Sequence, residues 1–181
     1  MALKDSRDGY SWLSIFFHWV TAVTVITLWL LAEIAEDAPK EEGFRLMGLH
    51  ISIAISLYLV LWARIFWRLS VRRPAGPVQH PLLGLLAIWV PYVLLAGIAI
   101  MLISGPLVVW STGNPINVFD LVSIPTPMEK SVSFHELMEE VHEFGATVLY
   151  FGVILHVLGG LKHLIIDRDG SFKKILVARN K

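Results

Sequence analysis

Apolar residues run along this chain in four long stretches separated by polar segments. A bilayer core about 30 Å thick requires about 20 predominantly apolar residues per helical span. Residues 12–33, 44–67, 82–104 and 141–166 each meet that length. The pattern therefore predicts an all-α membrane protein in which four transmembrane helices form an up-down bundle. Because the spans use about half of the chain, residues 1–181 are expected to form a single domain.

The composition agrees with lipid as the main partner, and it limits which metal and catalytic sites the chain can form. Hydrophobic residues make up 55% of the chain and charged residues only 17%, which is more apolar than an ordinary soluble domain. No nucleic-acid partner is expected. Because the chain has no cysteine, disulfides, thiolate metal sites and thiol catalysis are excluded, and histidine must carry any metal chemistry. The N-terminal segment has no signal-peptide cleavage site and reads as part of a retained first helix.

Charge is distributed unequally between the two sides of the predicted bundle. The first and third connections carry three basic and eleven acidic residues, a net charge of −8. The termini and the second connection carry twelve basic and four acidic residues, a net charge of +8. Basic residues concentrate on the cytoplasmic side of membrane proteins. Both termini are therefore expected in the cytoplasm of a bacterial cell, with the chain multi-pass in its inner membrane.

The connections are expected to be irregular, apart from one short helix. A proline- and glycine-rich segment separates the second and third spans, and residues 105–130 form a long proline-containing loop. Residues 131–140 are predicted to form a short amphipathic helix on the outer surface.

Four of the seven histidines fall inside predicted spans, namely His18, His50, His142 and His156. Ionisable or coordinating residues within a membrane are costly and are functional candidates by default. For any one of them, a hydrogen bond between helices is an alternative role. Four together are harder to explain in that way.

Spacing sorts these histidines into two pairs at two depths. His142 and His156 are 14 positions apart, which places them about 40° apart on one helix face and about 21 Å apart along the axis. Given the directions of the spans, His18 matches the inner His156 and His50 matches the outer His142. Two imidazoles at one depth suit the axial positions of a haem. Zinc would instead gather three or four ligands at one point.

Bis-histidine iron has no open coordination position, so it passes electrons rather than binding a substrate. A macrocycle also needs space between helices. Small residues lie near the candidate ligands, although they could equally serve close helix packing. These residues are Gly48, Gly145, Gly152, Gly159 and Gly160.

The remaining histidines have weaker claims. His135 lies seven residues before His142 and could replace it as the outer ligand, but it is expected in the interface. His80 lies beside Pro81 and is expected to be solvated. His163, seven residues beyond His156, could exchange protons with a quinone headgroup at the inner side, or it could simply snorkel there.

Several segments resemble the bacterial cytochrome b561 family, whose members are small di-haem inner-membrane proteins that exchange electrons with quinone. The resemblance covers nearly the whole chain and rests on SIFFHWV, LMGLHISIAISL, WARIFWRL, GNP and HEFGATVLYFGVILHVLGGLKH. It implies two b-type haems with axial ligands His18, His50, His142 and His156. It also matches His163 to a histidine at the quinone end. Arg64 and Arg68 match basic positions that neutralise the inner haem propionates, although topology alone would also place arginines there.

These inferences lead to one main hypothesis, a quinone-linked di-haem oxidoreductase that exchanges electrons between ubiquinone and a periplasmic redox partner. The resemblance also offers superoxide:ubiquinone oxidoreductase activity, since some members oxidise superoxide. The acidic outer loops should repel that anion and favour a basic partner instead. A hypothesis from another class is a cofactor-free helical anchor subunit of a larger complex.

Overall fold

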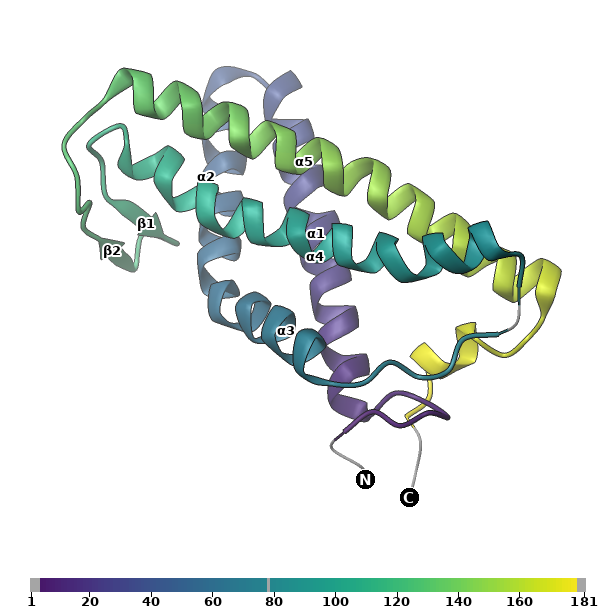
Figure 1. The fold of residues 1–181 in the computed structure, drawn as a ribbon. Helices are drawn as coiled ribbons and strands as arrows, with labels where there is room; N and C mark the ends of the chain where they lie inside the picture. Colours follow the sequence, from purple (N-terminus) through teal and green to yellow (C-terminus); the bar gives the residue numbers. More distant parts are fainter. Residues whose placement is uncertain (1–3, 78, 179–181) are drawn as a thin grey trace.

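The computed structural model describes residues 4–77 and 79–178, and helices dominate them (Figure 1). The five α-helices are α1 (Trp12–Asp37), α2 (Lys40–Ser56), α3 (Tyr58–Ser70), α4 (Pro81–Trp110) and α5 (Val132–Leu161). A π-helix, Lys162–Asp167, continues α5, and a 3₁₀ turn, Phe172–Ile175, lies near the C-terminal end. By length and composition three segments could cross a membrane, or four if the bent pair α2 and α3 counts as one span.

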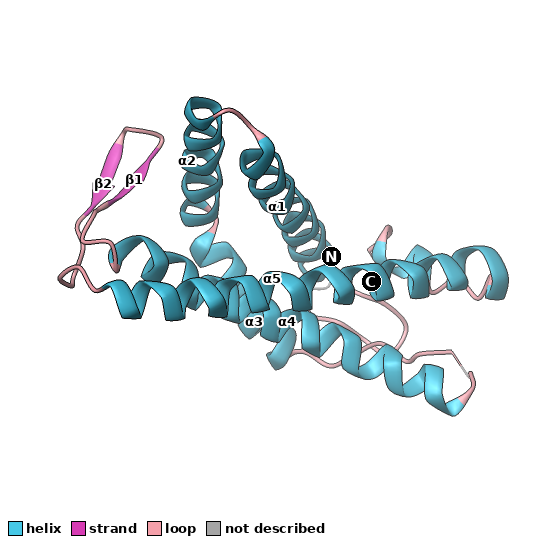
Figure 2. Cartoon of the chain, turned by 90° about the horizontal axis from the view of Figure 1, so that it is seen from above, coloured by secondary structure: helices cyan, strands magenta, loops and turns pink. Residues whose placement is uncertain are grey.

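The predicted second span is not one straight helix, because α2 and α3 are bent by 49° at Leu57. Serine hydroxyls explain where the break falls. Ser52 Oγ donates to the carbonyl of Gly48, and Ser56 Oγ donates to the carbonyl of Ser52. Such bonds compete with the backbone ladder of a helix and often bend it. The bend turns α3 toward α4 (Figure 2).

The third and fourth spans are longer than the hydropathy pattern predicts. α4 continues six residues past Ser104 and through Pro106, which the sequence placed in a loop. A proline removes one backbone donor, and here the flanking turns remain helical. The helix predicted for residues 131–140 is present from Val132, but it is not short, because it forms the first turns of a continuous α5. The following residues keep the helical pattern, so nothing ends the helix there.

Two helical hairpins form the frame. α1 packs against α2, and α4 packs along α5. The pairs cross steeply instead of lying parallel as in the expected simple bundle (Figures 1 and 2). α3 joins them, because the buried apolar cluster combines side chains of α3, α4 and α5. Its members are Leu61, Ile65, Leu95, Ile98, Leu102 and Leu149.

Glycines bring α4 and α5 into close contact. A Cβ atom added at Gly97 would lie 2.9 Å from Leu149 Cδ2, and one at Gly145 would lie 2.8 Å from both Ile100 and Met101. Gly152 meets α4 in the same way. The packing alternative is therefore confirmed for Gly145 and Gly152. At Gly48 and Gly159, by contrast, an added Cβ would meet no other atom within 4 Å.

The connections are ordered by specific contacts. Residues Ile116–Val118 (β1) and Val122–Ile124 (β2) form an antiparallel hairpin that the sequence did not predict. It is tied to α2 by a hydrogen bond from the Phe119 backbone N–H to Ser52 Oγ. On the other side, Asp5 accepts hydrogen bonds from the backbone and hydroxyl of Ser11, which caps α1.

Candidate metal centre

The inner pair of histidines is brought together from the two hairpins. The ring centroids of His18 on α1 and His156 on α5 lie 6.0 Å apart, with the ring planes at 56°. The Trp19 ring lies edge-on to His18 at 5.3 Å. Residues 138 positions apart in the sequence therefore face each other within the frame.

This spacing fits one metal ion between two imidazoles. A metal–nitrogen bond of about 2 Å on each side, plus about 1 Å from each nitrogen to its ring centre, separates the centroids by about 6 Å. The donor set is two imidazoles, which suits haem iron. The separation of the His18 and His156 rings therefore agrees with two histidines that hold one metal ion.

The outer pair is held by hydrogen bonds at one edge of each ring. His50 Nδ1 lies 2.8 Å from the carbonyl oxygen of Leu28 on α1. His142 Nδ1 lies 2.9 Å from Ser104 Oγ on α4. The two rings are close enough to interact electrostatically. Both hydrogen bonds use Nδ1, so Nε2 of each ring remains available as a ligand atom, as in many metal-binding histidines.

Positive charge lies beside the inner pair. Arg64 on α3 interacts electrostatically with both His18 and His156, and its Nε atom is buried without a hydrogen-bond partner. Arg68, one turn further along, is 7% exposed and lies 3.6 Å from Asp5 through Nη1 and Oδ2. An orphaned buried donor fits an anionic group such as a haem propionate, because unpaired buried polar atoms are costly. Arg68 Nη1 is likewise buried without a hydrogen-bond partner among the described residues. Arg64 nevertheless fits that role better, because Asp5 already balances the charge of Arg68.

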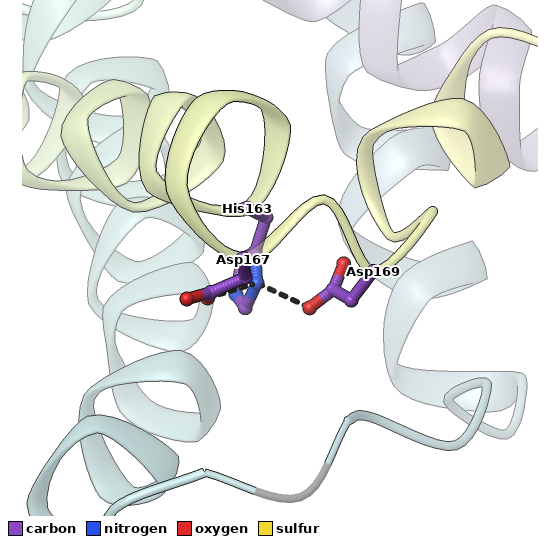
Figure 3. Close-up of side chains that lie close together, drawn as sticks. All are labelled: His163, Asp167 and Asp169. Carbon is purple, nitrogen blue, oxygen red and sulfur yellow. Dashed lines mark hydrogen bonds and ion pairs between the residues drawn. The ribbon is translucent and has the colours of Figure 1, made fainter.

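His163 lies in the π-helix and is fixed by acidic residues (Figure 3). Its Nδ1 donates to Asp169 at 2.8 Å and lies 3.2 Å from Asp167. Burial alone would raise the pKa of Asp169, but hydrogen bonds from Ser171 and His163 outweigh it and lower that pKa. The three side chains could gather around a cation, but the Lys162 amine already binds Asp167. The cluster is therefore best described as a histidine anchored to carboxylates.

His163 also borders a cavity of about 400 Å³ on the side of the termini. The N-terminal segment, the second connection, α4 and the C-terminal segment all contribute to its wall. The polar and charged side chains in the lining include Tyr10, Arg73, Gln79, Ser171 and Lys174. This volume is within the range of small-molecule sites in proteins, and the lining residues with full charge are basic.

Arg73 and Lys174 hold the cavity wall together. Arg73 donates to the carbonyls of Ala87 and Ile88 at 2.6 and 3.0 Å. Pro91 has no N–H for the Ala87 carbonyl four residues earlier, so Arg73 satisfies an acceptor that α4 leaves open. Lys174 donates to the carbonyl of Ala75 at 3.1 Å. The cavity is thus bounded by cross-linked segments.

The two other histidines occupy structural positions. His80 is exposed and caps α4 through Leu82 N. His135 lies in α5, with Nδ1 at 3.0 Å from both Ser111 Oγ and Val108 O. The sequence reasoning missed Leu28, Ser104, Arg73 and Asp169 as partners of candidate residues. Ser104 could have been found in the sequence, because it is a polar residue inside an apolar segment.

Comparisons with known proteins agree on one family. The sequence profile of the prokaryotic cytochrome b561 family matches residues 9–177. The chain is 28% identical to "Cytochrome b561 homolog 2" of Escherichia coli K12, over 97% of this chain and 95% of that protein. It is 24% identical to "Probable superoxide oxidase CybB" of Yersinia pestis, over 92% and 95%. A further relative, "Cytochrome b561 homolog 1" of Escherichia coli K12, is 23% identical over 95% and 99%.

Proposed function

The chain belongs to the prokaryotic cytochrome b561 family, and from that premise we propose that it carries electrons across the bacterial inner membrane through two haems b. The family establishes a helical membrane protein with b-type haem that transfers electrons. Our proposal adds four spans, two haem sites and exchange of electrons with the quinone pool at the inner side.

In this proposal, His18 with His156 would hold one haem and His50 with His142 would hold the other. The 6.0 Å separation of the inner rings carries the assignment, because unrelated polar contacts between helices would not require that spacing. The Nδ1 hydrogen bonds of His50 and His142 support the outer pair. Arg64 would neutralise propionates of the inner haem, and Arg68, which is paired with Asp5, would contribute to the same neutralisation.

When bound, two haems supply one-electron steps that together serve a two-electron quinone. The chain's own residues orient the ligands and exclude water from them. Buried Ser104 and the Leu28 carbonyl fix the outer rings. The apolar cluster packs α3 and α4 against α5, the helix that carries His142 and His156.

The quinone headgroup would bind in the cavity beside His163. Its volume of about 400 Å³ suits a small ring system, and His163 lies on its wall with Nδ1 held by Asp169. That anchoring leaves Nε2 to give or accept a proton as the quinone is reduced or oxidised. Because the wall includes both terminal segments, protons would be exchanged on the cytoplasmic side.

The test is a count of haem in purified protein by pyridine haemochrome, with reduced-minus-oxidised spectra. We expect about two haems per chain, and about one after His50→Ala or His142→Ala, because each change removes one axial ligand. His80→Ala is the matched control and should keep both. Unchanged haem content in both ligand variants would exclude the assignment. A protein without any Soret band would instead favour the helical anchor hypothesis.

A second candidate is superoxide:ubiquinone oxidoreductase activity. A relative that is named a probable superoxide oxidase favours it, whereas the net charge of −8 on the outer connections opposes it. Arg45, one of the three basic residues there, is already paired with Glu42, which leaves Lys40 and Lys130 to attract an anion.

Stopped-flow mixing with superoxide distinguishes this candidate from a periplasmic protein partner. If superoxide is the donor, it should reduce the haem faster than superoxide dismutates on its own. The double variant Lys40→Glu, Lys130→Glu should slow this reduction, and the effect should be largest at low salt. Haem reduction no faster than in a dismutase-treated control would count against superoxide as the donor.

A further inference from the structure

Serine and histidine pairs connect α4 to α5 at two levels of the helix pair. Ser104 lies beside His142, and Ser111 lies beside His135. Seven residues separate the two serines and seven separate the two histidines, so the contacts are equivalent rungs of an antiparallel pair, two turns apart. Both serines are fully buried, each with 0% exposure. Only one of the rungs includes a proposed haem ligand.

The direction of the hydrogen bond at the Ser104 rung follows from the proton count. Ser104 Oγ donates its single proton to the Ile100 carbonyl at 2.7 Å. The contact with His142 at 2.9 Å must then use an oxygen lone pair, with the proton on His142 Nδ1. The tautomer that results keeps Nε2 unprotonated, which is the form that binds iron.

Gly105, which follows Ser104 on α4, also restricts the His142 ring. A Cβ atom at this position would lie 3.3 Å from His142 Cε1, so glycine allows α4 to approach the ring closely. The Nδ1–Cε1 edge of His142 is therefore held against α4 by a hydrogen bond and by backbone contact.

We propose that Ser104 is a positioning residue that fixes the orientation of His142 and lowers the reduction potential of the outer haem. An acceptor on Nδ1–H makes the imidazole a stronger electron donor to the metal, which favours the ferric state. No hydrogen bond is made by the ring nitrogens of His18 or His156 within residues 4–77 and 79–178. The effect of Ser104 is thus confined to the outer haem. The inference rests on the proposed ligation by His142.

Redox titration of the purified holoprotein, followed by the α-band and by low-spin haem EPR, tests the proposal. Ser104→Ala should raise the midpoint potential of one haem, with about a tenfold change in its redox equilibrium, or about 59 mV for one electron. The EPR signal of that haem should change because its axial ring turns. Ser104→Thr keeps the hydroxyl and should restore both values.

Ser111→Ala is the matched control, since it removes the equivalent hydroxyl from His135. It should leave both potentials unchanged. If Ser111→Ala shifts a potential and Ser104→Ala does not, the outer ligand is His135 and the proposal is overturned. Unchanged potentials in Ser104→Ala, or equal shifts of both haems, also overturn it.

Loss of haem is informative as well. If Ser104→Ala loses one haem and Ser104→Thr keeps two, the positioning role is supported. If both variants lose haem, packing rather than the hydrogen bond is responsible, and the proposal fails. His142→Ala tests the ligation by itself. If that variant keeps two haems, the ligation by His142 is overturned. If it keeps one haem and Ser104→Ala has wild-type potentials, only the role of Ser104 is overturned.

Discussion

The histidines of the two pairs differ in what holds their rings. His50 and His142 are each fixed by a hydrogen bond to a neighbouring helix, whereas His18 and His156 face each other beside Arg64. Both the hydrogen bonds made by a ligand ring and the charge near it tune a haem potential. Residues outside the iron ligands are thus expected to make the two haems unequal.

For His163, a role in quinone chemistry is hard to distinguish from that of an ordinary interfacial side chain. Its Nδ1 is held by Asp169, and the lowered pKa of Asp169 shows that the fold favours its charged form. The charge contributes stability above the ordinary pKa of an aspartate and is lost as pH falls through the lowered value. The anchor is therefore intact at neutral pH.

Replacing His163 with alanine should slow the reoxidation of reduced haem by ubiquinone by about tenfold or more, because proton transfer loses its general acid and base. The haem spectrum should remain unchanged. Asp169→Asn should have a smaller effect in the same direction. Stopped-flow reoxidation measures both, with His80→Ala as the control on the same side. A normal rate in His163→Ala would identify His163 as an interfacial residue without a role in quinone chemistry.

At the scale of elements, the α1–α2 hairpin depends on close approach of backbone atoms. A Cβ atom at Gly43 would lie 2.8 Å from the Ala35 carbonyl oxygen. Backbone cannot rearrange as a flexible side chain can, so the added methyl must separate the helices. His50 Nδ1 donates a hydrogen bond to the Leu28 carbonyl across the same hairpin, which links this packing to the outer pair.

Gly43→Ala should therefore destabilise the protein by about 1–3 kcal/mol, the usual cost of overpacking. Thermal unfolding in detergent, followed by circular dichroism, measures the change. Gly84→Ala in α4 is the matched control, since an added Cβ there meets no atom within 4 Å and alanine favours a helix. Equal melting temperatures for the two variants would show that the hairpin tolerates a wider separation.

At the scale of the whole molecule, charge predicts how the protein lies in the membrane. The outer connections carry −8 and the opposite side +8, and the positive side should face the cytoplasm. The absence of cysteine makes this orientation easy to test, because each introduced cysteine is the only thiol in the chain.

Leu121→Cys, at a side chain that is 85% exposed near the β-hairpin turn, should react with a membrane-impermeant maleimide in spheroplasts. Lys173→Cys, at an exposed position near the C-terminal end, should react only after permeabilisation. Mass-tagged reagent and gel mobility measure the labelling. The reverse pattern would place the termini outside and the proposed quinone cavity on the periplasmic side.

The sequence by itself determined the long apolar segments, the family and the positions of four histidines within those segments. Hydropathy and helical spacing are local properties, so His142 and His156 could be placed on one face at two depths from numbering alone. The same local pattern led to errors where helices end. The pattern predicts a helix end at Ser104, although α4 continues past Pro106, and it predicts only a short helix at residues 131–140, although α5 is continuous from Val132.

Only the tertiary structure decided which groups meet. The ring separation of His18 and His156, the Ser104 contact to His142 and the Asp169 contact to His163 join helices or turns whose approach no local pattern specifies. The crossing of the two hairpins and the bend at Leu57 are also products of packing and of side-chain hydrogen bonds. Composition fixes what can enter a membrane, whereas distances between side chains depend on how the helices pack.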